Sequence, residues 1–370
     1  MEQIRTNIAK TSTGPVLVTL GALVLLVAGV IVSSGGNPLS LARLGTRYSL
    51  GDPQGTEGYD GQFVYYIARN WQPNDVAAYL DAPAYRYQRI LLPLLAHIIS
   101  SGNTAFIPWA LAALGVASHT LGTWVVTRLL IRWKINPWYA LVYGLWVGFL
   151  VAVRLDLPEP LAYALVAAAL LAIEKEHHRW GWALFALAVF AKEVTLIFAA
   201  GQGLAYLLRK DWPRALGLAV VTIVPFALFQ GWLWLVFGSP GVGSGGAMAT
   251  PFERIPLMGL WKIGKYSPLY LLAMAIVVIP FFLVPAFWGM WKAAEKLLKQ
   301  QPDNLVFALG LQGAIFLFLP FSTFREPGGT VRYASGLILA VLLFAGRDRH
   351  FRVLRYTPLW IVLNVFLLKG

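Results

Sequence analysis

Residues 15–33 read PVLVTLGALVLLVAGVIVS, a continuous apolar run that contains no charged side chain. A helix needs about 20 such residues to cross the ~30 Å hydrocarbon core of a membrane. Runs close to this length recur from end to end of the 370-residue chain, which is 58% hydrophobic and only 13% charged. Soluble domains carry about a quarter charged residues. The composition therefore excludes a water-soluble fold and predicts one transmembrane domain over residues 1–370.

The pattern of apolar runs predicts an all-α, polytopic fold with about ten or eleven membrane spans. The expected spans are 15–33, 105–131, 135–153, 158–174, 181–191, 194–208, 214–237, 268–290, 304–321, 331–346 and 357–369. Residues 89–101 are expected to lie at the membrane surface as a short helix. Arg5 and Lys10 precede the first run as in a signal peptide, but no convincing small-residue cleavage site follows, so we expect a retained anchor.

The basic residues predict which side of the membrane each loop occupies. The net charge is +13, but the lysines and arginines form short clusters between apolar runs, which indicates membrane topology and not nucleic-acid binding. With a cytoplasmic N-terminus, more than half of the 30 basic residues fall in the inner loops, as the positive-inside rule requires. Two long loops, 34–104 and 238–267, then lie outside. The glycine-rich stretch 241–246 in the second loop predicts a flexible lid or a plain linker.

The first outer loop carries the clearest local motif, YDGQFVYYIA at residues 59–68. We expect it to open a short helix, with the Asp60 carboxylate either capping exposed backbone N–H groups or serving in a site. Phe63, Tyr66 and Ile67 share one face of that helix, an arrangement suited to lying on the membrane surface. The same loop holds five of the 17 acidic residues, which marks it as the most chemically loaded segment.

Two further charged groups interrupt the apolar runs. Residues 154–160 read RLDLPEP. Arg154 either pairs with Asp156 or Glu159, or all of them contribute to a site. Lys192–Glu193 separates two short runs, which we expect to cross as a thinned hairpin with this pair at its outer tip. Because an ionised side chain in mid-membrane costs about 2.5–3.5 kcal/mol, the pair should border a cavity, unless its two charges neutralise each other.

Arginines also gather near the expected outer surface. Residues 84–89 read AYRYQR, and residues 325–333 read REPGGTVRY. Arginine offers planar, multidentate donors that suit phosphate, and the neighbouring aromatic rings suit sugars. The alternative for both stretches is an anchor of arginine and tyrosine side chains at the membrane interface.

The sequence also excludes several classes of chemistry. The chain contains no cysteine, so disulfides, thiolate metal sites and cysteine nucleophiles are ruled out. It contains neither an H-E-x-x-H pair nor a phosphate loop of the G-x-x-x-x-G-K-[ST] or G-x-G-x-x-G type. Neither ATP nor a dinucleotide is therefore expected to drive its activity.

Taken in order, these motifs resemble those of the GT-C glycosyltransferases, polytopic enzymes that take a sugar from a polyprenyl-phosphate donor. Tyr59-Asp60-Gly61, followed by an aromatic-rich helix, is similar to the W-D-G-type motif of the GPI mannosyltransferases. Pro158-Glu159-Pro160-Leu161 resembles their second acidic motif. The run from Tyr59 to Pro93 is also similar to a group of bacterial membrane proteins linked to cell-surface glycopolymer formation. The likeness covers residues 10–210 and Arg332-Tyr333.

The resemblance implies an inverting glycosyl transfer to a glycan or lipid acceptor, at the outer face of a bacterial plasma membrane. Asp60 would be the general base. Asp156 and Glu159 would orient the acceptor or, together with Asp60, hold a divalent cation such as Mg²⁺ or Mn²⁺. The residues implied to bind the donor phosphate are Lys192, Arg325, Arg332, Arg86 and Arg89. The residues implied to support them are Tyr59, Gln62, Glu193 and Tyr333.

Two other functions stay open. One is a flippase or other transporter of a lipid-linked sugar, although the chain shows no convincing internal repeat of the kind that transporters carry. The other is a non-catalytic subunit that kept this architecture and serves as a scaffold in a membrane assembly. The acidic residues gather on one expected face of the membrane, which favours one-sided chemistry over alternating access.

Overall fold

The computed structural model describes the backbone of residues 2–369 and the side chains of residues 13–365 and 367. Every regular element in this part of the chain is a helix, as the sequence predicts. The side chains of Arg5 and Lys10, expected just before the first span, lie outside the described residues.

The elements follow one another without a long break. The first half of the chain forms α1 (Glu2–Ser33), η1 (Pro38–Leu41), α2 (Thr46–Ser49), α3 (Gly61–Arg69), α4 (Pro73–Val76), η2 (Ala77–Tyr79), α5 (Pro83–Tyr87), α6 (Leu91–Ile99), α7 (Ile107–Arg132), η3 (Pro137–Ala140), α8 (Leu141–Gly144), α9 (Val147–Arg154) and α10 (Glu159–Glu174). The second half forms α11 (His178–Ala191), η4 (Glu193–Thr195), α12 (Leu196–Leu208), α13 (Trp212–Phe237), α14 (Met258–Gly264), α15 (Pro268–Val278), η5 (Ile279–Leu283), α16 (Val284–Leu298), α17 (Asn304–Leu317), α18 (Phe321–Arg325), α19 (Pro327–Tyr333), α20 (Ser335–Arg347), α21 (Phe351–Tyr356) and η6 (Thr357–Lys369). The η elements are 3₁₀ helices, except η5, which is a π-helix.

Five helical segments of the described chain are long and apolar enough to cross a membrane. These segments are Thr13–Ser33, Ile107–Arg132, Trp212–Phe237, Pro268–Leu298 and Pro327–Arg347. A sixth span results if Pro137–Gly144 and Val147–Arg154 are counted together, with a bend of 49° between them. The chain is therefore all-helical and has the character of an integral membrane protein.

The other expected spans fall on helices shorter than the ~20 residues of a full crossing. Helix α10 has 16 residues, α11 and α17 have 14 each, α12 has 13, and the expected span 357–369 forms the 13-residue 3₁₀ helix η6. Local sequence sets their ends. Helix α11 stops at Lys192, where the backbone becomes extended. Helix α17 begins after Asp303, whose side chain accepts hydrogen bonds from the backbone N–H groups of Leu305 and Val306.

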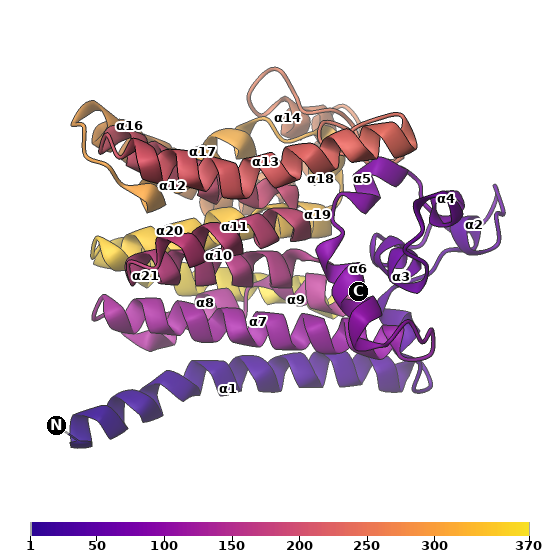
Figure 1. Cartoon of the computed structure of the whole chain (residues 1–370), viewed down its shortest axis with the longest axis horizontal. Helices are drawn as coiled ribbons and strands as arrows, with labels where there is room; N and C mark the ends of the chain where they lie inside the picture. The colour runs from indigo at the N-terminus through magenta and orange to yellow at the C-terminus, as the bar shows by residue number, and fades with distance from the viewer. Residues whose placement is uncertain (1, 370) are drawn as a thin grey trace.

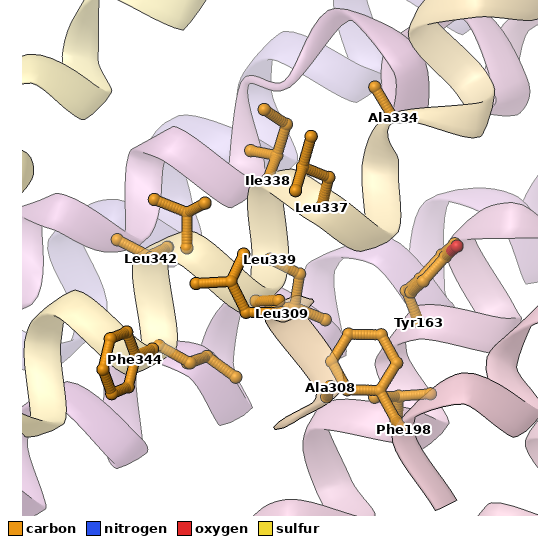
Figure 2. Packing of buried hydrophobic residues seen from close by; sticks show 14 of the residues in the cluster. Tyr163, Phe198, Ala308, Leu309, Ala334, Leu337, Ile338, Leu339, Leu342 and Phe344 are labelled. Atoms are coloured by element: carbon orange, nitrogen blue, oxygen red, sulfur yellow. The ribbon is translucent and has the colours of Figure 1, made fainter. Parts of the chain in front are cut away.

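The main apolar core lies around α20, whose residues from Ser335 to Gly346 are buried without exception. Figure 2 shows side chains of α20 and α17 in this core, among them Leu339 and Leu309. Helices α1 and α13 instead expose apolar side chains, such as Leu25 and Leu228. Apolar side chains on the outside as well as in the core fit surroundings of lipid.

The polar segments collect at one end of the bundle. Figure 1 shows the long helices lying roughly parallel, with residues 34–90 gathered beyond their ends on one side. We call this the loop end. Helix α1 runs the length of the bundle, so the N-terminus lies at the opposite end (Figure 1). The candidate site lies at the loop end.

The expected surface position of the helix in residues 59–68 is wrong. The helix forms, as α3, but Phe63, Tyr66 and Ile67 are buried inside the protein. They share an apolar cluster with residues of α6, α7 and α13. Because other helices of the chain cover that face, no apolar stripe remains for the membrane surface. The short helix expected over 89–101 is present as α6.

Candidate functional site

Asp60 stands at the start of α3 but does not cap it. Its side chain accepts no hydrogen bond from the helix N-terminus, and its φ and ψ of −55° and −29° are already helical. Capping residues hold non-helical angles. The carboxylate instead forms an ion pair with Arg86, whose Nη1 lies 2.9 Å from Oδ1, and accepts a hydrogen bond from Arg332 Nη2 at 3.2 Å. The capping interpretation is therefore wrong, and this side chain, 33% exposed, belongs to a charged cluster.

Arg86 joins Asp60 to a second carboxylate. It lies on α5, and its Nε and Nη2 donate to the two oxygens of Asp81 at 2.7 and 2.8 Å. Its guanidinium also lies over the Phe63 ring, 4.3 Å from the ring centroid. Two parallel hydrogen bonds and an aromatic face fix the plane of a guanidinium. Arg86 therefore presents its remaining nitrogen to Asp60 in a fixed position.

Arg332 reaches Asp60 from a distant part of the sequence. It lies on α19, and its Nε donates to Glu159 Oε1 at 2.8 Å, while its Nη1 donates to the Tyr59 hydroxyl at 3.0 Å. Glu159 is the first residue of α10 and is 0% exposed. Its Oε1 also accepts from Lys192 Nζ at 2.7 Å. The carboxylate thus has two cationic partners and the favourable end of a helix dipole.

Lys192 and Glu193 are adjacent in the chain but take different partners. Lys192 pairs with Glu159, whereas both carboxylate oxygens of Glu193 accept from Arg89, at 2.6 and 2.8 Å. Arg89 also donates to the Tyr85 hydroxyl at 2.8 Å. The two adjacent charges therefore do not neutralise each other, because an extended backbone sends successive side chains in different directions.

Asp156 occupies the turn between α9 and α10, with a φ of +51°, and is 3% exposed. Neither of its carboxyl oxygens has a hydrogen-bond partner among the described residues. Burial raises the pKa of Asp156 well above its ordinary value, which favours the neutral carboxyl group. The expected ion pair with Arg154 is therefore wrong. Glu159, the other expected partner of Arg154, bonds to Lys192 and Arg332.

The cluster is electrically balanced. The linked side chains alternate in sign, with three negative and three positive charges, in the order Asp81, Arg86, Asp60, Arg332, Glu159 and Lys192. Burial alone would raise the pKa of Asp60, but Arg86 and Arg332 outweigh it and hold that pKa well below its ordinary value. Asp60 is therefore a carboxylate at neutral pH and, in this state, a weak base.

Two of the three carboxyl groups that the resemblance implies as metal ligands are already engaged by cationic side chains. The resemblance implies a divalent cation held by Asp60, Asp156 and Glu159, but no three His, Cys, Asp or Glu side chains are grouped as ligands within residues 13–365. Asp60 and Glu159 are already bonded to cationic side chains, which a metal would have to displace. The proposed function below therefore uses no metal.

Three other predicted residues lie outside this chain of ion pairs. Arg325 is exposed on α18, with its guanidinium 5.9 Å from the centroid of the Phe321 ring. Gln62 is buried and donates to the carbonyl oxygen of Glu57 at 2.7 Å, which holds the loop in front of α3. Tyr333 packs against the apolar core. The roles expected for them, phosphate binding by Arg325 and support by Gln62 and Tyr333, stay predictions.

Two acidic side chains that contact the cluster are not recognised as site residues from the sequence. Asp81 binds Arg86, and Glu326 accepts a hydrogen bond from the Tyr59 hydroxyl. Both lie in stretches that the sequence marks as rich in charge. No local pattern separates them from neighbouring acidic residues, because their partners are set by the packing of distant helices.

The loop after α13 also touches the cluster. The backbone N–H of Ala247 donates to Asp81 at 2.9 Å. A Cβ added at Gly246 would lie 2.6 Å from Arg86 Nη2, so a larger residue here would displace the Arg86 guanidinium. The glycine-rich stretch 241–246 is the sequence signal for this contact. No family model, curated protein or solved structure matches the chain.

Proposed function

We propose that this protein is a GT-C-type glycosyltransferase that moves a sugar from a polyprenyl-phosphate donor to a glycan or lipid acceptor. The observation that carries the proposal is the meeting of Asp60 with Arg86 and Arg332 at the loop end. Such a transfer requires a carboxylate near fixed positive charge, because the acceptor loses a proton while the donor loses a phosphate.

The proposal includes about ten or eleven spans, counting the short helices, and a loop end on the outer face of a bacterial plasma membrane. The distribution of lysine and arginine supports a cytoplasmic N-terminus. A site at the membrane rim is accessible both to a lipid-bound donor and to an extracytoplasmic acceptor. Arg325, exposed beside an aromatic ring, offers a first contact for the lipid phosphate.

In the proposed reaction, an acceptor hydroxyl oxygen attacks the anomeric carbon of the donor sugar. The bond between that carbon and the phosphate oxygen breaks, and its electron pair leaves with the polyprenyl phosphate. Asp60 takes the acceptor proton. Arg86 and Arg332 stabilise the departing phosphate, and the single displacement inverts the anomeric configuration.

The balanced charge of the cluster suggests an order of binding. Arg86 and Arg332 are already bonded to carboxylates, so the donor phosphate must compete for them. When Arg86 or Arg332 releases Asp60 and pairs with the donor phosphate, Asp60 loses a neighbouring positive charge. The pKa of Asp60 then rises from its low resting value. We therefore expect the donor to bind first and to make Asp60 a stronger base.

Transfer of radiolabelled sugar from a panel of polyprenyl-phosphate donors tests the proposal, with purified wild type compared with Asp60→Asn. A general base contributes about 10²–10⁴-fold, so transfer by the folded variant should fall by a factor of that size. Asp52→Asn is the matched control, because Asp52 lies in the same loop and accepts from the Gln54 backbone N–H at 2.9 Å.

The outcomes separate the role of Asp60 from the function as a whole. Equal transfer by wild type and Asp60→Asn would remove Asp60 from catalysis. No transfer by wild type with any donor in the panel would contradict the proposed glycosyltransferase activity.

A further inference from the structure

A cavity of about 340 Å³ opens at the loop end, beside the C-terminal end of α3. Its lining includes the side chains of Tyr66, Arg69, Asn70, Asp75, Tyr79 and Thr104. Small-molecule sites in proteins occupy roughly 300–1,000 Å³, so the cavity has the size of a binding site. It shares no residue with the ion-pair chain around Asp60, and the proposed reaction does not use it.

The cavity combines aromatic walls with hydrogen-bonding groups of both kinds. The rings of Tyr66 and Tyr79 lie 5.4 Å apart at an angle of 39°. The Arg69 guanidinium lies 5.9 Å from the centroid of the Tyr79 ring. Asn70 Nδ2 donates to Asp75 Oδ2 at 3.3 Å. A ligand here meets a guanidinium and an amide as donors, a carboxylate as an acceptor, and flat apolar ring faces.

These groups suit a neutral sugar better than an anion or a lipid chain. A sugar hydroxyl both donates and accepts hydrogen bonds, and bonds to charged side chains are the stronger ones. Arg69 and Asp75 carry opposite charges, so the lining has no surplus positive charge for a phosphate. A hydrocarbon chain would strip water from both charged groups without replacing its hydrogen bonds, which is costly.

We propose that this cavity binds a neutral sugar residue of the acceptor glycan, which rests on the proposed function for the identity of the acceptor. Helix α3 has nine residues and separates the cavity from Asp60. At 1.5 Å per residue, the lining residues Tyr66 and Arg69 lie about 9 to 13 Å from Asp60 along the helix axis. A single sugar does not span that distance. The acceptor is therefore an oligosaccharide, with its terminal hydroxyl at Asp60 and an inner sugar in the cavity.

An array of neutral and anionic oligosaccharides, probed with the full chain in lipid nanodiscs without donor, tests this assignment. Wild type should bind neutral oligosaccharides. Tyr79→Ala removes an aromatic wall and Asp75→Asn removes a charged acceptor while keeping its shape, and each should weaken binding by about tenfold. Asp52→Asn makes the same chemical change elsewhere in the loop and should bind like wild type.

Three results would overturn the assignment: no glycan binding by wild type, binding of anionic glycans only, or unchanged binding by both cavity variants. The array contains no polyprenyl phosphate, so its result does not depend on transfer. If both cavity variants transfer sugar and bind the array like wild type, the cavity is not a glycan site, and the proposed function stands. Cavity-dependent glycan binding by a protein that transfers no sugar would reject the proposed function and keep the cavity as a glycan site.

Discussion

Among single residues, Glu159 and Asp156 show two different ways in which a carboxyl group is buried. Glu159 is buried as an anion, because Lys192 and Arg332 both donate to it. Asp156 is buried without a hydrogen-bond partner among the described residues, and its raised pKa favours the neutral form. Removing the charge from these two side chains should therefore have different consequences for stability.

Glu159→Gln should destabilise the protein strongly, whereas Asp156→Asn should leave its stability close to that of wild type. The first change leaves Lys192 buried without its counter-charge, and breaking a buried ion pair costs about 3–5 kcal/mol. The second replaces a neutral carboxyl with a neutral amide of the same shape. Thermal unfolding of both variants in one detergent measures the difference. Equal stability of Glu159→Gln and wild type would contradict the buried ion pairs.

The sequence indicates the members of the cluster better than it indicates their partners. Charged side chains inside membrane spans are rare, which makes Arg332 visible as a candidate, while Asp60 stands out by the motif that it opens. Sequence proximity then suggests pairing within Lys192–Glu193, but the structure pairs each of these residues with a distant one. Asp60 and Arg332 themselves are 272 positions apart. Such pairs depend on helix packing, which no local pattern encodes.

Among the elements, α3 determines where Asp60 lies. A Cβ added at Gly61, its first residue, would lie 2.1 Å from the carbonyl oxygen of Leu155 in the turn between α9 and α10. The start of α3 is therefore in direct contact with the turn that leads to Glu159. This contact holds the Asp60 carboxylate close enough to Glu159 for Arg332 to contact both side chains.

Gly61→Ala should lower both stability and transfer, because the added methyl group pushes α3 away from the turn. Forcing an extra carbon into a packed site costs about 1–3 kcal/mol. Gly21→Ala is the control, since no heavy atom lies within 4 Å of a Cβ at that position of α1. Alanine there should be neutral or stabilising by up to about 1 kcal/mol. Unfolding curves of Gly61→Ala and Gly21→Ala that coincide would contradict the docking of α3.

The existence of α3 is predictable from the period of its apolar residues, but its surroundings are not. Periodicity shows that Phe63 and Tyr66 share a face, and it does not show whether lipid or protein covers that face. In the structure, residues of α6, α7 and α13 cover it. The helix therefore serves as a buried support for Asp60 and not as a surface anchor.

In the whole molecule, five or six long helices define the membrane character, while several apolar helices are too short for a full crossing. Hydropathy alone does not separate a short buried helix from a membrane span. The position of α10 and α17 relative to the bilayer thus stays a prediction. The separation of the N-terminus from the loop end is visible in Figure 1, and the orientation of the two ends in the membrane stays a prediction.

Single-cysteine variants test that orientation cleanly, because the chain contains no cysteine. Gln54 is exposed at the loop end, and Lys175 is exposed in the turn between α10 and α11. A membrane-impermeant maleimide added to intact cells should label Gln54→Cys and leave Lys175→Cys unlabelled until the membrane is opened. Labelling of Lys175→Cys alone in intact cells would reverse the orientation and contradict an outward-facing site.

Donor binding by Asp60→Asn tests the central claim, that Asp60 and the donor phosphate share Arg86 and Arg332. Replacing the carboxylate with an amide removes the negative charge that pairs with both arginines. Equilibrium binding of a radiolabelled polyprenyl-phosphate sugar to the folded variant should therefore be as tight as binding to wild type, or tighter. Weaker binding by a variant that unfolds at the wild-type temperature would contradict the claim.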